Sequence, residues 1–426
     1  MSLLVMAAFV VIASLGVPLA FALGLSAVVG LIASDLPFNM LPTRMMNALD
    51  SFPLLSIPLF MAAGELMIKA GIMEQLIDFS LAFIGRVRGG LAQVAMLAGA
   101  ILSAVSGSAV SDASALASTM HPPLKKNYGA GFSTAVISAS ANLGPIIPPS
   151  GAMIVYAYMA GPSVSVGGLF MAGTIPGILL TAIFMFQCWW IAKKRNYPVT
   201  GEPVSVRNIV VQTKRSFITL LMPVVCIGGI VAGIFTATEG AAIGVVFALV
   251  IGFFVTRTLK LSDLPHVLLR SALMSAVVGA MIAFASTVTY MLTIDLLPHQ
   301  LAAWLRSITA DPLMFMLIVA AMLVVVGTFL ESNASYIMLV PLLHPIALAY
   351  GIDPTLFAFL FILNLVIGMI HPPVGVVLFV VCGMTGVKMA EVFWNVLPFI
   401  LSMYAVLFLC MFFPPLVTWL PKALGY

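Results

Sequence analysis

The sequence predicts an all-helical membrane protein that crosses the bilayer several times and is built from two related halves. Three observations support this fold class. Hydrophobic residues make up 62% of the 426 residues and charged residues only 8%, and the mean hydropathy is +1.19. Apolar runs recur along the whole chain, and one pattern of polar and proline-rich segments occurs twice. A soluble domain of this length needs far more charged surface than this composition provides.

The apolar runs are continuous rather than alternating, which favours helices over the strands of a membrane β-barrel. The first run continues to Ile32 and has no basic residues before it, so we interpret it as a retained helix rather than a signal peptide. The small net charge of +4 lies in the loops, so we expect no nucleic-acid partner. The four cysteines lack CxxC spacing and predict neither a disulfide framework nor a metal site.

An internal repeat divides the chain into two halves. The segment SGSAVSDASALASTMHPPL (106–124) resembles VGTFLESNASYIMLVPLLHPIAL (326–348). Further along, NLGPIIPPSGAMIVYAYMAG (142–161) resembles NLVIGMIHPPVGVVLFVVCGMTG (364–386). The second copies follow the first by a nearly constant distance of about half the chain. Apolar segments resemble one another by chance, but the shared Asn and Pro-Pro-x-Gly positions argue against that explanation.

Basic residues orient the two halves relative to the membrane. The linker 193–215 contains six Lys or Arg residues, and the loop after the first polar segment contains Lys125 and Lys126. By the positive-inside rule both are expected on the cytoplasmic side. The equivalent loop of the second half, 349–354, has no basic residue and contains Asp353, so we expect it outside. Equivalent loops on opposite sides indicate inverted repeats, which are typical of secondary transporters.

Each half contains a proline-rich interruption, GPIIPPSG (144–151) or GMIHPPVG (368–375). Proline lacks an N–H donor and clashes with the preceding turn, so neither interruption lies inside a continuous helix. The apolar arms beside them are too short to span a bilayer. We therefore predict two re-entrant helical hairpins, 130–160 and 354–383, with Pro-Pro-x-Gly tips. The alternative is an ordinary kinked helix.

A polar segment precedes each hairpin, with Gly107 in the first half and Gly327 in the second. Small residues permit local unwinding, and the freed carbonyls together with hydroxyl oxygens suit Na⁺. The alternative is that the serines only pack or bond to their own helix. Asp112 and Glu331 could each bind a cation, relay a proton or cap a helix, and for Asp112 we favour capping or a supporting role. His121 and His344 lie beside prolines, where we expect loops rather than ligands.

These motifs resemble the large membrane subunit of tripartite ATP-independent periplasmic (TRAP) transporters. The resemblance covers essentially the whole chain and is most specific in SGSAVSDASA, NLGPIIPPSG, GMIHPPVGVVLF and the opening GVPLAFALG. It implies an elevator mechanism in the bacterial inner membrane and Na⁺-coupled uptake of an organic acid, such as a C4-dicarboxylate or a sialic acid. It also implies two partners, a small four-helix membrane subunit and a periplasmic substrate-binding protein.

The resemblance further implies where ions and substrate bind. A first Na⁺ site would use Ser103, Ser106, Gly144, Ile147 and Pro149, and a second would use Gly327, Thr328, Gly368 and Met369. The substrate would bind between the two tips, among Ser108, Asp112, Asn142, Ser150, Asn333, Asn364 and His371. Neither tip motif contains an arginine, so helix N–H dipoles and hydroxyls, or a more distant basic group, would hold its carboxylate.

The two halves of the domain organisation follow from the repeat, and the division into scaffold and transport elements is what the resemblance implies. We expect a first repeat over 1–195 (scaffold helices 1–90, transport elements 91–195), a cytoplasmic linker over 196–215, and a second repeat over 216–426 (scaffold helices 216–310, transport elements 311–426). Amphipathic stretches at 40–50 and 261–270 are expected to dock the small subunit. The sequence contains no HExxH motif and no paired carboxylates in a GxGD-type context, so we expect no enzyme activity. A proton-coupled carrier and a passive channel for organic anions remain as alternatives.

Overall fold

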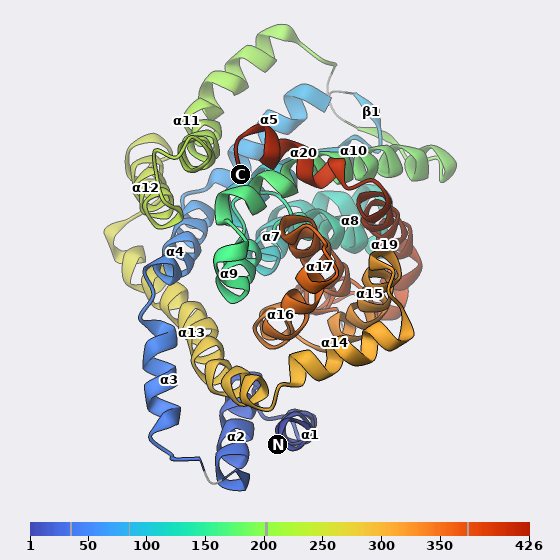
Figure 1. Ribbon diagram of the computed structural model, residues 1–426. Coiled ribbons are helices and arrows are strands. Elements are labelled where there is room, and N and C mark those ends of the chain that lie inside the picture. Colours follow the sequence, from blue (N-terminus) through green and yellow to red (C-terminus); the bar gives the residue numbers. More distant parts are fainter. Residues whose placement is uncertain (35, 85, 201–202, 373–374) are drawn as a thin grey trace.

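The chain forms a bundle of helices with one short pair of strands (Figure 1). The computed structural model describes all residues except 35, 85, 201–202 and 373–374, and the side chain of Phe329. The prediction of an all-helical protein is confirmed, apart from the two-residue strands β1 (Val87–Arg88) and β2 (Val199–Thr200), which pair antiparallel.

The first half of the chain supplies ten of the labelled α-helices. These elements are α1 (Ser2–Ser14), α2 (Leu19–Ala33), α3 (Met40–Leu49), the 3-10 helix η1 (Phe52–Leu55), α4 (Ser56–Lys69), α5 (Ile72–Ile84), α6 (Gly90–Ser106), α7 (Ala109–Tyr128), α8 (Ala130–Ala141), α9 (Gly151–Ala160), the 3-10 helix η2 (Gly161–Ser163) and α10 (Val166–Lys194).

The second half supplies the others. These elements are α11 (Val206–Val231), α12 (Ala237–Val250), the π-helix η3 (Ile251–Val255), the 3-10 helix η4 (Leu261–Asp263), α13 (Leu264–Ile294), α14 (Leu297–Ile308), α15 (Pro312–Phe329), α16 (Ser332–Ala349), α17 (Pro354–Gly368), α18 (Val376–Thr385), α19 (Met389–Phe412) and α20 (Pro415–Ala423). Because α11 begins at Val206, the linker predicted over 196–215 is helical in its last part.

Seven helical segments of the described chain are long and apolar enough to cross a membrane. An eighth is reached if α14 and α15, which meet at 115°, are counted as one bent span. The seven segments are Phe52–Lys69, Val166–Lys194, Val206–Val231, Ala237–Val255, Leu261–Ile294, Ser332–Ala349 and Met389–Phe412. The length and apolar character of these segments follow directly from the composition, since about 20 apolar residues span the hydrocarbon core.

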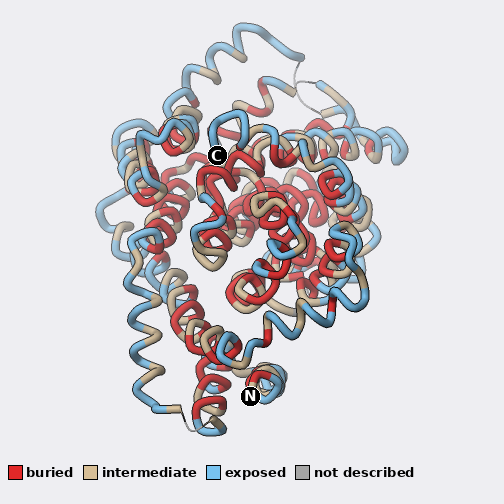
Figure 2. Tube along the Cα trace, in the orientation of Figure 1, coloured by how far each residue is buried: buried red, intermediate tan, exposed pale blue. Residues whose placement is uncertain are grey.

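The helices fall into two groups. The outer helices, α1–α5 and α11–α14, form an arc along the upper, left and lower parts of Figure 1, and the inner helices, α6–α10 and α15–α20, cluster beside it. Buried residues concentrate in the inner helices, whereas the outer helices carry long exposed stretches (Figure 2). Many of the exposed side chains are large and apolar, as a surface in contact with lipid requires.

The packing pattern of the first half recurs in the second. Helix α6 packs on α8 as α15 packs on α17, and α7 packs on α8 as α16 packs on α17. Helix α2 packs on α13 as α12 packs on α4. The second arm of each proline-rich unit crosses to the other half, so that α9 packs on α16 and α18 packs on α7. The repeat seen in the sequence is therefore also a repeat of helix contacts.

Candidate functional site between two helix breaks

The first polar segment is a break between two helices. Helix α6 ends at Ser106, and Gly107 follows with φ +61°, a left-handed conformation that favours glycine. Ser108 then caps α7, where its hydroxyl accepts the backbone N–H of Ser111 at 3.4 Å. The local unwinding predicted from the small residues is thus present at this point of the chain.

The tip of the first proline-rich unit packs against this break. A Cβ atom on Gly107 would collide with the carbonyl oxygen of Pro149. A Cβ on Gly144 would lie 3.0 Å from both the backbone nitrogen of Ala109 and a carboxylate oxygen of Asp112. Glycine is therefore required on both sides, because only glycine lets the two backbones approach this closely.

Asp112 is the buried polar centre of the first break. Its carboxylate is fully buried and accepts the hydroxyl of Ser103 at 3.1 Å and the hydroxyl of Ser106. These bonds join the end of α6 to the first turn of α7, where a negative charge is favoured by the helix dipole. This arrangement matches the supporting role that the sequence favours for this carboxylate.

Several backbone oxygens at the first break are free. The carbonyls of Ser106, Gly144, Ile147 and Pro149 accept no hydrogen bond from the residues that the structure describes. A buried carbonyl without a donor is uncommon, because it loses its bonds to water without replacement. Oxygens of this kind are the ligands that a hard cation such as Na⁺ uses in broken-helix transporters.

The second break repeats this arrangement with different side chains. Helix α15 ends at Phe329, and Glu331 caps α16 by accepting the backbone N–H of Ala334 at 3.1 Å. The other carboxylate oxygen of Glu331 accepts the side-chain amide of Asn333 at 2.9 Å. Glu331 is thus the cap of a helix, and its two oxygens already have donors.

The second tip lies against the end of α15. A Cβ on Gly368 would overlap the backbone of Gly327, so the two glycines are in direct backbone contact. The carbonyls of Gly327 and Thr328 accept no hydrogen bond from described residues, whereas that of Met369 accepts the N–H of Val377 at 2.9 Å. The second set of predicted Na⁺ ligands therefore has fewer free carbonyls than the first.

A cavity of about 140 Å³, here called the central cavity, lies between the two breaks and the two tips. It is enclosed on one side by α4 and α13 of the outer helices and on the other by inner helices. Among the described residues that line it, none is basic. Its polar and tip residues are Gly107, Ser108, Pro145, Gly151, Glu331, Ser332, Asn333, Tyr336 and Met369.

The comparisons with known proteins decide the family. The model of the DctM component of tripartite ATP-independent periplasmic transporters matches residues 5–416. The chain belongs to this family. It is therefore a multi-pass membrane protein of a bacterial TRAP transporter, a transporter permease and not an enzyme, and the resemblance stated from its motifs is confirmed.

Full-length relatives support this assignment of the DctM chain. It is 35% identical to the C4-dicarboxylate TRAP transporter large permease protein DctM of Rhodobacter capsulatus, with 96% of each chain covered. It is 35% identical, at the same coverage, to the sialic acid TRAP transporter large permease protein SiaM of Vibrio cholerae. The isethionate TRAP transporter permease protein DctMQ of Oleidesulfovibrio alaskensis is 33% identical over 94% of this chain but only 63% of its own length.

A solved structure supports the fold of the DctM chain. The YdaH transporter of Alcanivorax borkumensis superposes with a TM-score of 0.64 over 89% of both chains. The sequence identity is only 16%, so the similarity concerns the fold alone.

The structure brings only part of the predicted substrate set to the central cavity of this DctM chain. Ser108 and Asn333 line it, whereas the amide of Asn142 donates to the carbonyl of Val366 at 2.8 Å and that of Asn364 donates to Ala320 at 2.9 Å. Both asparagines thus bond buried backbone of neighbouring helices.

The remaining predicted substrate residues have contacts of their own. Ser150 caps α9 and donates its hydroxyl to the carbonyl of Pro145 at 2.8 Å. Asp112 binds the two serines described above, and the Nδ1 atom of His371 lies 2.6 Å from the carbonyl oxygen of Pro372. Residues 373–374 of the second Pro-Pro-x-Gly motif lie outside the described part of the chain.

Two histidines were expected in loops, and this prediction is wrong. His121 lies within α7 and His344 within α16, both buried, because the prolines beside them are accommodated inside these helices. His344 bonds the hydroxyl of Tyr156 at 3.0 Å and that of Ser163 at 2.9 Å, which joins α16 to the second arm of the first unit.

Sequence reasoning missed Tyr336. This residue lines the central cavity, is fully buried, and its hydroxyl has no hydrogen-bond partner among the described residues. A buried hydroxyl without a partner is costly, which makes it a candidate contact for a polar ligand. Its position one turn after Asn333 in the second polar segment was the signal that could have identified it.

Proposed function

We propose that this DctM chain performs Na⁺-coupled uptake of an organic acid anion by an elevator mechanism. The observation that carries the proposal is the central cavity itself, which lies where both helix breaks and both tips converge. Paired broken helices around one midplane site are the arrangement by which secondary transporters bind substrate and coupling ion together. The outer helices would serve as scaffold and the inner helices as the moving transport domain.

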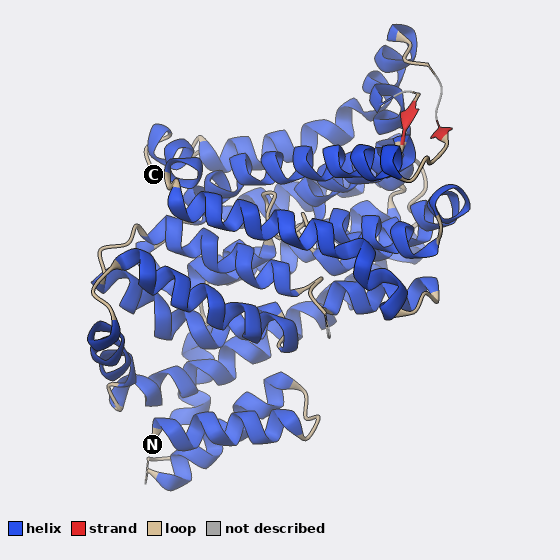
Figure 3. Cartoon of the chain, turned by 90° about the vertical axis from the view of Figure 1, so that its right-hand side faces the viewer, coloured by secondary structure: helices blue, strands red, loops and turns tan. Residues whose placement is uncertain are grey.

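Inverted topology of the two halves is part of this proposal. The short strands β1 and β2 pair residues 87–88 with 199–200, at one end of the molecule (Figure 3). The carboxyl terminus lies at the opposite end, and Asp353 after α16 pairs with Lys422 in α20 at 3.1 Å. The basic linker and the loop that contains Asp353 thus lie on opposite sides, as inverted repeats require.

The first proposed Na⁺ site consists of the free carbonyls at Gly144, Ile147 and Pro149 with the region of Ser103 and Ser106. The donor hydrogens of both serines are directed to Asp112, so their oxygen lone pairs remain available to a cation. The buried Asp112 charge would lower the free energy of a Na⁺ ion nearby without contacting it.

The second proposed site consists of Gly327 and Thr328 with Gly368 and Met369. The Thr328 hydroxyl donates its hydrogen to the carbonyl of Val325 at 2.8 Å. As for the two serines, the lone pairs of the Thr328 oxygen therefore remain available to a cation. Each Na⁺ that enters down a potential of 100 mV contributes about 2.3 kcal/mol, so two ions would supply about 4.6 kcal/mol. That is sufficient for more than about a thousandfold accumulation of a substrate without compensating charge.

The substrate class follows from the chemistry of the central cavity and from relatives. Ser108, Asn333 and Tyr336 offer hydroxyl and amide groups, and the N-termini of α7, α9 and α16 point their dipoles toward this region. Two of the relatives named above carry C4-dicarboxylate and sialic acid in their names, and the third carries isethionate. We infer a carboxylate-bearing anion of one of these classes.

Two partners complete the proposed transporter. The chain covers only 63% of the DctMQ relative, which supports the interpretation that the remainder of that relative corresponds to the small membrane subunit. For this chain we expect a separate four-helix subunit docked on the outer helices. Helix α3 has no buried residue and packs on α13, so its outer face is free for such a partner.

Uptake into proteoliposomes tests the proposal. The chain and its small subunit are reconstituted and supplied with labelled organic acids, with or without the binding protein and an inward Na⁺ gradient. Uptake that requires both is expected. Uptake driven by a proton gradient alone, or flux insensitive to any gradient, would replace the proposal with the carrier or channel alternative.

A further inference from the structure

One face of α4 runs from the central cavity to a second, larger cavity. Ile57 and Met61 line the central cavity, and Glu65 and Lys69 line the second, which we call the polar recess. The recess has a volume of about 710 Å³. Residues four apart lie on the same side of an α-helix, so these four side chains form one continuous row.

The neighbouring helix α13 has the same arrangement. Val278 and Met274 line the central cavity, and Arg270 and His266 line the polar recess. These residues are again four apart, and α4 packs directly on α13. The two rows therefore run from one cavity to the other along packed helices, and we call the strip between them the groove. Arg270 is about 6 Å along α13 from the lining of the central cavity, at about 1.5 Å per residue.

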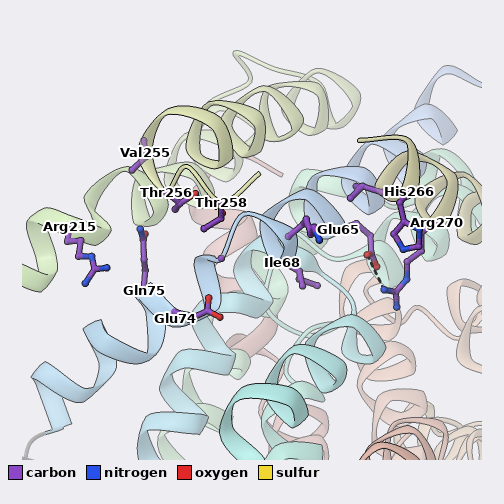
Figure 4. A pocket seen from close by; sticks show the side chains of 13 residues that line it. Glu65, Ile68, Glu74, Gln75, Arg215, Val255, Thr256, Thr258, His266 and Arg270 are labelled. Atoms are coloured by element: carbon purple, nitrogen blue, oxygen red, sulfur yellow. Dashed lines mark hydrogen bonds and ion pairs between the residues drawn. The ribbon is translucent and has the colours of Figure 1, made fainter. Parts of the chain in front are cut away.

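An ion pair crosses this groove at the boundary between the two cavities. Arg270 Nη1 lies 3.6 Å from Glu65 Oε2, with the side chain of Glu65 only 8% exposed and that of Arg270 55% exposed (Figure 4). The other carboxylate oxygen of Glu65 accepts the hydroxyl of Ser111 at 3.4 Å. Glu65 thus joins two outer helices and the first turn of α7 next to the first break.

We propose that Arg270 is a transit site for a carboxylate of the transported anion, and that Glu65 is the exchangeable counter-ion that occupies it between transport events. The inference rests on the proposed function, and it assigns the path between the central cavity and the cytoplasm. It also identifies the distant basic group that the tip motifs lack.

Exchange of one carboxylate for another keeps the free-energy cost of moving the anion out of the central cavity small. The central cavity offers an anion only dipoles and neutral groups, so an anion that leaves it needs a cation in the groove. A guanidinium binds a carboxylate through two parallel hydrogen bonds, and the substrate reproduces the interaction that Glu65 gives up. During the exchange Glu65 keeps the hydroxyl of Ser111, which limits the penalty of its unpaired buried charge.

The polar recess fits a cytoplasmic vestibule. The adjoining segment 256–260 contains Arg257 and Lys260, which the positive-inside rule places on the cytoplasmic side. Two other cations that line the recess are paired on its periphery, Lys69 with Asp263 at 3.3 Å and Arg215 with Asp78 at 3.5 Å. Arg270 differs from them because its partner Glu65 is buried and because it lies one turn of α13 from Met274, which lines the central cavity.

Counterflow in proteoliposomes tests this proposal with the complete transporter. Vesicles loaded with unlabelled organic acid exchange it for labelled acid, and the exchange rate reports passage through the groove. Arg270→Gln is expected to lower this rate about tenfold or more, because it removes the charge-assisted hydrogen bonds to the carboxylate. Glu65→Gln leaves Arg270 without its counter-ion and should lower the half-saturating internal concentration.

Two further variants keep the result interpretable. Glu65→Gln with Arg270→Gln removes both charges, so it leaves no unpaired buried carboxylate and should fold while showing the same loss of exchange. Arg207→Gln is the matched control, because Arg207 is an exposed residue at the start of α11 outside both cavities. If the single and double Arg270 variants exchange at the wild-type rate, and the wild-type protein shows Na⁺-driven uptake, the transit site is wrong and the proposed function is not. If the wild-type protein shows no Na⁺-driven uptake, the proposed function itself is wrong.

Discussion

Gly368 at the end of α17 lies directly against Gly327 near the end of α15, so that a Cβ on Gly368 would overlap the backbone of Gly327. This contact joins the second tip to the second helix break. It has a counterpart in the first half, where Gly107 lies against Pro149. Two such backbone contacts hold the walls of the central cavity together.

Gly368→Ala tests the second contact. The added methyl group has no room, so the tip must move away from α15 and the proposed second Na⁺ site must open. We expect uptake to fall at least about tenfold, with a loss of stability of about 1–3 kcal/mol from overpacking. Gly383→Ala in α18 is the control, because no atom lies within 4 Å of its Cβ position. Equal uptake in both variants would refute the tip–break contact.

Gly107→Ala tests the first contact and separates it from backbone strain. Gly107 has φ +61° and ψ 15° and faces Pro149, whereas Gly386 has the same left-handed conformation, with φ +70° and ψ 12°, and nothing within 4 Å of its Cβ position. Alanine at a left-handed position costs about 1–2 kcal/mol at either site, so the strain is matched. Only Gly107→Ala should also abolish uptake. Comparable transport losses in the two variants would show that strain alone is responsible.

Asn142→Ala tests whether the buried amide bonds hold the two halves together. Asn142 donates to Val366 of the other half, while Asn127 donates to Pro123 within its own helix, both at 2.8 Å. We expect Asn142→Ala to lower the free energy of unfolding by about 1–3 kcal/mol and Asn127→Ala by less than about 0.5 kcal/mol. Titration with SDS in mixed micelles measures both. A smaller loss for Asn142 than for Asn127 would contradict this account.

Tyr336→Phe and Tyr156→Phe form a matched pair that tests the polar lining of the central cavity. The Tyr156 hydroxyl bonds His344, so its removal strands a ring nitrogen and should cost about 1–3 kcal/mol. The Tyr336 hydroxyl has no partner among the described residues, so Tyr336→Phe should not lower stability and should raise it if the hydroxyl is unsatisfied in the folded protein. In uptake assays we expect Tyr336→Phe to raise KM several-fold at unaltered Na⁺ dependence. An unchanged KM would remove Tyr336 from the proposed substrate site.

The sequence predicted the first helix break at Gly107 and the positions of both tips, because proline and glycine impose local backbone conformations. The second break was expected at Gly327, but this glycine is still helical and α15 ends only at Phe329. The pairing of each tip with the break of its own half was implied by the family resemblance.

The sequence could not predict which side chains form hydrogen bonds with residues far away in the chain. The resemblance implied Asn142 and Asn364 as substrate residues, but their bonds to the carbonyls of Val366 and Ala320 depend on tertiary packing and could not be predicted from the sequence. The crossing of α9 to α16 and of α18 to α7 is likewise a property of tertiary packing. His344 was expected in a loop because prolines stand beside it. Inside a membrane protein, however, a buried segment must satisfy its backbone hydrogen bonds, and this requirement keeps the segment helical.

The Na⁺ dependence of uptake in Ser106→Ala and Thr328→Val tests most directly whether the two breaks hold the coupling ions. With two sites, wild-type uptake should rise with Na⁺ concentration with a Hill coefficient approaching about 2, since this coefficient is limited by the number of sites. Each substitution removes one proposed ligand, so each should raise the half-saturating Na⁺ concentration and lower the coefficient toward about 1. Thr328→Val should leave melting in detergent unchanged, whereas Ser106→Ala also removes a donor to the buried Asp112 and should lower the melting temperature. Wild-type Na⁺ dependence in both variants would contradict the assignment of the coupling ions to the helix breaks.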